Sequence, residues 1–483
     1  MNGTARRFAT GAGWLYGYRW LERLLDFVAI VVLARILAPD DFGLVAIAAS
    51  VVTIIEGLSA LDVNKALIRA RDEDRALYDS AWTLSAIRGF ASALIMIAIA
   101  AFVSDARIAG VLYALALSPI LTALSNPRFV MFERDLVYSR LALLTLGARL
   151  VAFAVTLVIA VLYRSYWALV LGMLAGSLVG MILSYALRPY LPRFRLARAS
   201  DIFGFSGWLS LTSIVTTLSM ETDKIIVGRL LGVADAGLYF MTQRVGVLPT
   251  RELVSPLQRI LFPSFSELAD DSERLRRVAS ESINVLGSLS LPAAFGFALV
   301  ANDFVPLALG DQWLAIVPLL AILVPYLGLR ATLSMTLPCV MAQGKTKLLF
   351  WVSFVYALVH LPAFIAGTAL FGLAGAIWSI VAAGVFYSYL NAWLLKRTLG
   401  IGLGEILAQI RRPLAAAAVM VGVVLAAATA LPFELFSASG SWLSLAIKIA
   451  VGGLVFCGAL YSMWRLEGHP PGIEQRLLQL LSR

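Results

Sequence analysis

Long apolar segments, separated by short polar or charged clusters, occupy almost the whole chain. A helix needs roughly 20 mostly apolar residues to cross the hydrocarbon of a bilayer. Division of the sequence at charge clusters and at Pro or Gly turns therefore predicts about 14 membrane-spanning helices in an all-α polytopic protein. The predicted spans are 14–37, 41–62, 81–103, 108–128, 140–162, 166–187, 205–232, 236–258, 282–301, 313–336, 347–370, 373–395, 412–431 and 442–464.

The composition excludes a water-soluble protein. Hydrophobic residues make up 60% of the 483 residues and charged residues only 14%, whereas globular domains average about 45 to 50% apolar and about 25% charged. Cys339 and Cys457 lie inside apolar runs, which argues against a disulfide-stapled external domain and a cysteine metal site. Only two histidines are present, which argues against histidine catalysis. We expect no cofactor.

The Lys and Arg residues of the connecting segments predict the orientation. With a cytoplasmic amino terminus, twenty-six of them fall inside, and only Arg35, Arg107, Arg164 and Arg229 fall outside. This bias follows the positive-inside rule and places both termini in the cytoplasm. The net charge of +10 thus reflects orientation, and we expect no nucleic-acid partner.

The two ends of the chain carry further patterns. Charges at Arg19, Glu22, Arg23 and Asp26 interrupt the first apolar run, which argues against a cleaved signal peptide. The segment 465–483 has leucines at roughly helical spacing, which predicts an amphipathic tail on the cytoplasmic membrane surface. A frayed tail is the alternative.

No catalytic constellation is present. No outward-facing connection exceeds about a dozen residues, which leaves little room for the external site of a glycan polymerase or ligase. The sequence also lacks a grouped acid, base and nucleophile. We therefore expect a transporter or a passive membrane protein, and no enzyme.

A short repeat divides the chain. "LARILAPDDFGL" at 33–44 matches "VGRLLGVADAGL" at 227–238, with Arg, Leu, Asp, Gly and Leu in common at an offset of 194 residues. Six predicted spans separate the copies, so the halves keep the same orientation, as parallel repeats do. The predicted architecture is two six-helix lobes, 1–198 and 199–398, related by a pseudo-two-fold axis along the membrane normal. Two extra helices in 399–464 follow. The alternative is that any Gly-containing hairpin after an Arg looks alike.

The same segments resemble a known family. "ARILAPDDFGLVAIA", "TDKIIVGRLLGVADAGLY" and "LQRILFPSFSEL" are similar to the polysaccharide transporters of the multidrug, oligosaccharidyl-lipid and polysaccharide exporter superfamily. The closest likeness is to bacterial lipid-linked oligosaccharide flippases. This resemblance implies an inner-membrane protein that carries undecaprenyl-diphosphate-linked sugar units to the outer leaflet for lipopolysaccharide, exopolysaccharide or capsule synthesis. It also implies membrane lipids, and glycan polymerase and co-polymerase proteins, as partners.

Nine cations fall within the predicted spans. Each costs about 2.5 to 3.5 kcal/mol at the bilayer centre, so most must face protein, water or an interface. Eight are candidates for a cleft that binds the diphosphate and sugars, and Lys448 is expected to snorkel to the interface instead. The eight are Arg19, Arg23, Arg88, Arg149, Lys224, Arg244, Arg251 and Arg330.

Helical spacing groups several of these charges. Arg19, Glu22, Arg23 and Asp26 share one face of the first span. The seventh span carries a polar stripe that ends in Glu221 and Lys224. In the eighth span Arg244 and Arg251 are seven residues apart, and Pro249 between them predicts a kink.

Two interpretations of these charges remain open. The cations can bind the diphosphate through paired hydrogen bonds from guanidinium groups. Alternatively, acids in the spans neutralise them in buried pairs that only hold helices together. Nine cations against six acids favour an anionic cargo. The acids are Glu22, Asp26, Glu56, Glu221, Asp223 and Glu252.

Asp223 shares a helical face with Thr216 and Ser219. A carboxylate beside hydroxyls in low dielectric can take a proton or coordinate Na⁺, so Asp223 is a hypothetical site for a coupling ion. A helix-packing hydrogen bond is the alternative.

The sequence thus predicts a flippase whose lobes alternate in access around a cationic cleft. A drug or metabolite exporter of the same superfamily is one alternative, and a non-transporting scaffold for glycan assembly is another.

Overall fold

The computed structural model describes residues 3–59, 67, 74–135, 137–199, 207–430 and 441–468. These residues form helices joined by short connections, with no strand among them. By their contacts they divide into two compact units, Met1–Gly228 and Arg229–Arg483. Nearly all of helix α11, which the sequence repeat assigns to the second lobe, 199–398, packs with the first unit.

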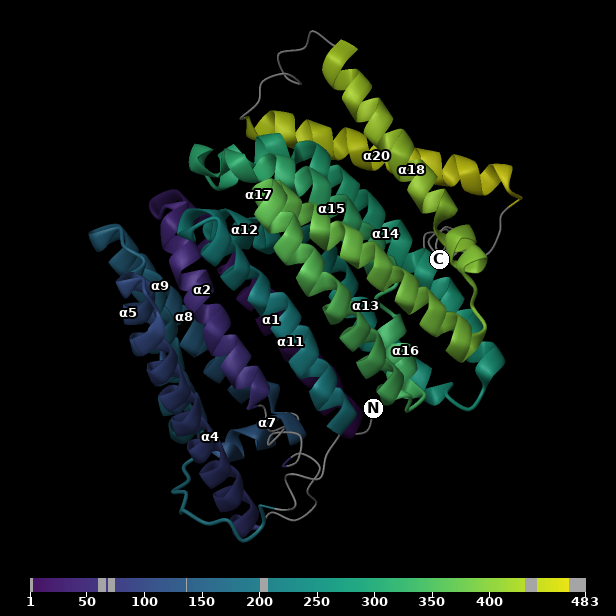
Figure 1. Ribbon diagram of the computed structural model, residues 1–483. Coiled ribbons are helices and arrows are strands. Elements are labelled where there is room, and N and C mark those ends of the chain that lie inside the picture. Colours follow the sequence, from purple (N-terminus) through teal and green to yellow (C-terminus); the bar gives the residue numbers. More distant parts are fainter. Residues whose placement is uncertain are drawn as a thin grey trace. The chain divides into compact units, whose positions relative to one another are not determined.

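Long helices make up the first unit, with short turns between them (Figure 1). The α8–α9 hairpin packs closely because Gly172 faces Thr156 and Gly176 faces Ala152, where a larger residue would not fit. The helices are α1 (Gly3–Ile36), α2 (Pro39–Leu58), α4 (Arg75–Phe102), α5 (Ala106–Leu115), α6 (Leu117–Ala123), α7 (Met131–Arg134), α8 (Tyr138–Tyr163), α9 (Trp167–Leu187) and α11 (Gly207–Leu230).

The second unit is built around α14 and the long α17 (Figure 1). α17 comprises two helices joined at Gly372, whose φ of 61° and ψ of −147° are accessible almost only to glycine. The elements are α12 (Val233–Gly246), α13 (Leu248–Glu267), α14 (Ser272–Ala308), the 3₁₀ turn η2 (Asp311–Ile316), α15 (Val317–Thr332), α16 (Thr336–Ala342), α17 (Thr346–Leu399), α18 (Leu403–Ala430) and α20 (Trp442–Leu466).

Each predicted span falls on helix in the described residues, although the boundaries differ. Ten helices of the described chain are long and apolar enough to cross a membrane, and one of them, α17, holds two predicted spans. α1, α11 and the α12–α13 pair are not among the ten, and each carries several charged residues. The number of crossings therefore remains a prediction. The tail 465–483 lies outside the described residues from position 469 onward.

The repeated turns have matching local structure. α1 ends at Ile36 and α11 at Leu230, while α2 begins at Pro39 and α12 at Val233, so both boundaries recur at the 194-residue offset. The capping differs: Asp41 accepts a hydrogen bond from the Ala38 amide, whereas Gly232 occupies the same place with a positive φ. The repeat therefore preserves helix ends through different local chemistry.

An extended basic segment, residues 188–198, follows α9 in the direction of α11. It lies along the start of α4. Polar side chains of α4 accept its backbone N–H groups: Asp79 from Arg193 at 3.0 Å, Thr83 from Arg195 at 3.0 Å and Ser80 from Arg198 at 3.1 Å. These bonds replace the partners that a strand or helix would supply. The segment is thereby held against α4, with Phe194 and Leu196 exposed.

Asp79 is the centre of this attachment. Its side chain is only 2% exposed, and it also accepts a hydrogen bond of 2.6 Å from the Tyr190 hydroxyl. Burial and the hydrogen bond to Asp79 raise the pKa of Tyr190, so the phenol remains a donor at neutral pH. The Arg128 guanidinium lies 4.8 Å from the centre of the Tyr190 ring.

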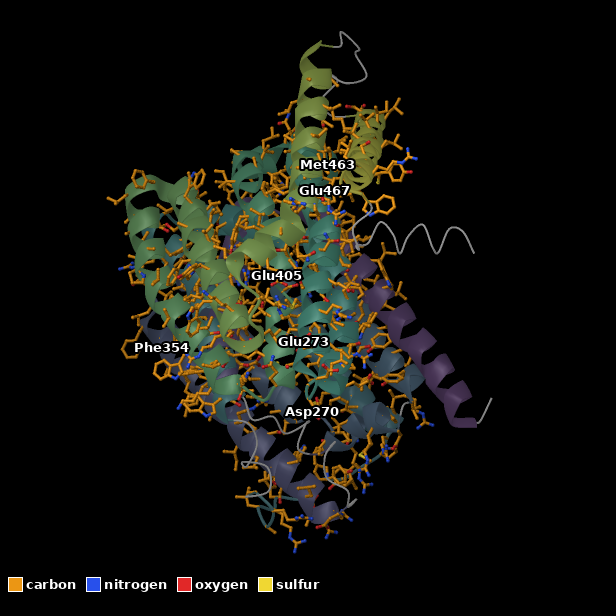
Figure 2. The ribbon with its side chains drawn as sticks, turned by 90° about the vertical axis from the view of Figure 1, so that its right-hand side faces the viewer. Asp270, Glu273, Phe354, Glu405, Met463 and Glu467 are labelled. Atoms are coloured by element: carbon orange, nitrogen blue, oxygen red, sulfur yellow. The ribbon has the colours of Figure 1, made fainter. Side chains whose placement is uncertain are left out.

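The last two helices of the described chain are attached to α14 along their length. Arg276 pairs with Glu405 at 2.8 Å, and Asn284 donates to the Gln409 carbonyl at 2.8 Å. At the far end of α20, Glu467 pairs with Arg411 of α18 at 3.0 Å; Figure 2 labels both Glu405 and Glu467. α18 and α20 are thus integral to the second unit.

The expectation that Lys448 snorkels to the interface is wrong. Its ammonium group lies 2.7 Å from a carboxylate oxygen of Asp303, and the two side chains are 13% and 2% exposed. Asp303 was missed because α14 continues to Ala308, past the predicted span end at 301. A buried carboxylate therefore compensates Lys448 inside the protein.

We expect Asp79→Ala to lower the free energy of unfolding by about 2 to 3 kcal/mol, because a buried phenol and a backbone amide lose their acceptor. Thermal unfolding of the purified protein in detergent measures this. Asp40→Ala is the control, since the Asp40–Arg107 pair is exposed and such pairs contribute about 0 to 1 kcal/mol. Equal effects of the two substitutions would contradict the role given to Asp79.

Lys448→Met and Asp303→Leu should each destabilise the protein by roughly 3 to 5 kcal/mol, because either leaves a buried charge without a partner. The double variant should recover most of that loss, since it removes both charges. The same unfolding measurement decides the matter. Additive losses in the double variant would mean that the two groups act independently.

Candidate functional site

Charged side chains of α1 meet polar side chains of α8 in the first unit. α1 is continuous, so Arg19, Glu22, Arg23 and Asp26 share one face, as their spacing predicts. The guanidinium of Arg149 on α8 lies 3.2 Å from a carboxylate oxygen of Asp26. We call these five residues the α1–α8 charge cluster.

The acids of the cluster touch more than one cation. Glu22 interacts electrostatically with Arg149 and Arg19, and Thr145, one turn before Arg149, borders it. The Arg19 guanidinium also lies 5.9 Å from the Tyr18 ring, and its buried Nε has no hydrogen-bond partner in the described structure. Three cations and two acids leave the cluster with a formal surplus of one positive charge.

The same helices also carry exposed apolar side chains. On α1, Trp20, Leu24 and Phe27 lie roughly a third of a turn around the helix from the centre of the charges, and the Arg23 guanidinium lies 5.9 Å from the centre of the Trp20 ring. On α8, Leu143 and Val158 are exposed roughly a third to a half of a turn from Arg149. These apolar side chains suit lipid, so α1 and α8 each carry a lipid-compatible surface beside their charges.

The Arg149–Asp26 pair is left largely uncovered by the rest of the protein, unlike Lys448 and Asp303. The side chains of Arg149 and Asp26 are 56% and 38% exposed. An exposed ion pair contributes only about 0 to 1 kcal/mol to stability. The Arg149 guanidinium has five N–H donors and donates one hydrogen bond to Asp26, which leaves donors for an anionic ligand.

Two more polar groups of the first unit involve predicted site residues. Glu56 of α2 interacts electrostatically with Arg88 of α4. On α11, Lys224 donates to Glu221 at 2.6 Å. The structure therefore contains the charge pair that the polar stripe of the seventh span predicts.

Asp223 is buried on α11. Thr216 donates to the Thr212 carbonyl at 2.8 Å and Ser219 to the Val215 carbonyl at 2.9 Å. The hydroxyl protons are therefore used within the helix, while the hydroxyl oxygens remain as acceptors or cation ligands. No three His, Cys, Asp or Glu side chains in the described part of the chain are grouped as a metal site.

In the second unit the helix is interrupted at Val247, close to the predicted kink. α12 ends at Gly246 and α13 begins at Leu248, with Pro249 in its first turn. The Val247 amide still donates to the Gln243 carbonyl and the Arg251 amide to the Val247 carbonyl, so the shared face of Arg244 and Arg251 stays a prediction. Arg251 is exposed and Arg244 is half-buried; Glu252 follows Arg251 on α13. Arg330 lies among tyrosines of α15 and α17.

The family model for the polysaccharide biosynthesis protein family matches residues 32–318, more than half of the chain. The chain belongs to this family. The match includes both repeated turns and the helices that carry Arg149 and Lys224. Arg330 lies beyond it.

Named relatives of this polysaccharide biosynthesis protein cover most of its length. The lipopolysaccharide biosynthesis protein WzxC of Escherichia coli K12 is 26% identical over 390 residues, 78% of each chain. The succinoglycan biosynthesis transport protein ExoT of Rhizobium meliloti 1021 is 27% identical over 386 residues, 76% of this chain and 74% of its own.

Solved structures confirm the fold class of the polysaccharide biosynthesis protein. The lipid II flippase MurJ in an inward closed conformation matches with a TM-score of 0.72 at 14% identity, over 93% of this chain and 98% of its own. An inward-facing multidrug resistance MATE family transporter of the MOP superfamily matches with a TM-score of 0.58 at 14% identity, over 79% and 95%. The all-α membrane fold is thus confirmed.

We expect Arg149→Gln to change the free energy of unfolding by less than about 1 kcal/mol, because its pair with Asp26 is largely exposed. Lys448→Met, which breaks a buried pair, is the reference for a structural ion pair. If Arg149→Gln destabilises the protein as much as Lys448→Met in the same detergent, the α1–α8 charge cluster is a packing device.

Proposed function

We propose that this protein is a flippase that moves undecaprenyl-diphosphate-linked oligosaccharide units from the cytoplasmic to the outer leaflet of the bacterial inner membrane. The observation that carries the proposal is the surplus of cations in the α1–α8 charge cluster, whose Arg149–Asp26 pair is left largely uncovered by the rest of the protein. The glycan units would serve lipopolysaccharide, exopolysaccharide or capsule synthesis. Alternating access of the two sequence-defined lobes would move them.

The relatives support the cargo class. The names of the two relatives refer to lipopolysaccharide and succinoglycan biosynthesis, and one is called a transport protein. The solved structure with the higher TM-score of the two is named a lipid II flippase. Transfer of this role to the present chain is consistent with its membership of the polysaccharide biosynthesis protein family.

The chemistry of the charge cluster suits a diphosphate. A diphosphate concentrates negative charge on several oxygens, and a planar guanidinium binds two of them at once. Arg149 keeps unused N–H donors, and Arg19 and Arg23 are on the facing side of α1. Glu22 and Asp26 would hold the arginines in place between transport cycles. No bond of the cargo is made or broken, so the role requires no catalytic residue.

Several parts of the proposal come from the sequence. The positive-inside bias supports cytoplasmic termini. Asp223 is the proposed site for a coupling H⁺ or Na⁺. Polymerase and co-polymerase proteins are the proposed partners, because a flipped unit must next be polymerised.

The test is transport of a fluorescent undecaprenyl-diphosphate-linked oligosaccharide in proteoliposomes, followed by loss of fluorescence to an external quencher. Arg149→Gln and Arg23→Gln should each slow flipping roughly tenfold to a hundredfold. The reason is that a charge-assisted hydrogen bond contributes about 1.5 to 3 kcal/mol. The variants must first be shown to be folded and inserted.

Arg107→Gln is the control, since Arg107 is an exposed cation paired with Asp40 at the start of α5. It should flip the oligosaccharide like the unchanged protein. Absence of flipping above protein-free vesicles would contradict the function itself, in favour of a scaffold. Export of cationic dyes by the same vesicles would favour the drug exporter, and unchanged flipping by Arg149→Gln would dismiss the charge cluster as the binding site.

A further inference from the structure

Arg330 is surrounded by tyrosines in the second unit. It lies in the last turn of α15, one helical turn after Tyr326, with which it is hydrogen-bonded. Its guanidinium lies 5.7 Å from the centre of the Tyr387 ring, and Tyr356 also interacts with it electrostatically. Tyr356 and Tyr387 come from the two halves of α17, and their ring centres are 4.8 Å apart. We call Arg330, Tyr326, Tyr356 and Tyr387 the arginine–tyrosine cluster.

No carboxylate compensates Arg330. Neither α15 nor the 54 residues of α17 contain an Asp or Glu, and Arg330 forms no ion pair in the described part of the chain. Other cations of the predicted spans differ in this respect: Lys448 has Asp303, Lys224 has Glu221, and Arg149 has Asp26. Arg330 is therefore an unneutralised cation at membrane depth, where an unneutralised charge is unfavourable.

The cluster offers an anion several hydrogen-bond donors. The guanidinium has five N–H donors and no acceptor, and each phenol has one O–H donor. A compact group with several acceptor oxygens would satisfy these donors and neutralise Arg330 together. A cation or an apolar ligand would do neither.

Neighbouring residues hold the rings in position. The Tyr326 phenol occupies the space where Gly384 has no side chain, so a larger residue at 384 would displace it. Tyr356 stacks on His360, with ring centres 5.2 Å apart, and His360 contacts Phe364 at 5.5 Å. These three lie at four-residue spacing on one side of α17, whereas Phe354 projects outward (Figure 2). The donors are thus preorganised by packing.

We propose that the arginine–tyrosine cluster is a second anion-binding site, in the second unit, for an oxyanion carried by the lipid-linked glycan. The identity of the ligand rests on the proposed flippase function; the anion site itself does not. Two groups of such a cargo share the required chemistry, the diphosphate and the carboxylate of an acidic sugar.

The experiment is calorimetric titration of the purified full-length protein in detergent with three probes: inorganic pyrophosphate, glucuronate and glucose. Arg330→Gln should weaken binding of at least one anion tenfold or more. Arg149→Gln should retain this Arg330-dependent component. Loss of the pyrophosphate component assigns the diphosphate, loss of the glucuronate component assigns an acidic sugar, and glucose should not bind through Arg330.

Arg465→Gln is the matched control, because Arg465 also lies over a tyrosine, Tyr461, at 5.6 Å, but at the exposed end of α20. It should leave every titration unchanged. Tyr326→Phe and Tyr387→Phe keep the rings and each remove one hydrogen-bond donor. They should weaken binding of the same anion several-fold, and they test the site if Arg330→Gln fails to fold.

Three results would overturn the proposal: full anion binding by folded Arg330→Gln, an equal loss in Arg465→Gln, or no effect of the two Tyr→Phe variants. Reduced thermal stability of Arg330→Gln with unchanged binding would make the cluster a helix-packing contact only. The titrations need no transport, so failure of the flipping assay with intact Arg330-dependent binding would refute the flippase and leave the anion site standing.

Discussion

The unfavourable free energy of a charge inside hydrocarbon is the constraint on which this structure depends. Each cation within the spans needs a counter-charge, a neighbouring hydrogen-bond acceptor or water. Lys448 and Asp303 solve the problem by burial as a pair, which gives a fixed contact between α20 and α14. Arg149 and Asp26 form a pair that the rest of the protein leaves largely uncovered, so the guanidinium remains available. Arg330 has only phenols. The three solutions separate a structural charge from those that can meet a ligand.

The apolar pattern was sufficient to predict the helices, because a span is defined by its own residues and needs no knowledge of its neighbours. The shared face of Arg19, Glu22, Arg23 and Asp26 followed in the same way from a continuous helix. Helix ends were less predictable. α14 runs from Ser272 to Ala308, well beyond the apolar core at 282–301, and this extension hid Asp303 and led to the wrong expectation for Lys448.

Contacts between segments far apart in the chain could not be predicted from the sequence. Nothing in residues 188–198 indicates that their backbone amides bond to side chains of α4, because that attachment depends on where two helices end. The tyrosines near Arg330 were likewise counted as apolar residues of their spans. A usable signal did exist for Thr145, which lies one turn before Arg149, and for the complete absence of acids from α17. Absence of a counter-charge is visible in a sequence only when the helices that could supply one are known.

The repeated turns indicate what was preserved along the chain and what was free to change. Both α2 and α12 begin at the same offset from the preceding helix, yet Asp41 caps one turn and Gly232 with positive φ makes the other. The charges diverge further: α1 carries a row of mixed charges, whereas α11 carries one half-buried pair beside hydroxyls. Helix boundaries are set by the thickness of the membrane and are therefore constrained equally in both copies. Under the proposed function, the side chains at membrane depth would be constrained by the cargo instead, and a cargo with a charged head group at one end of a sugar chain would require the two halves to differ.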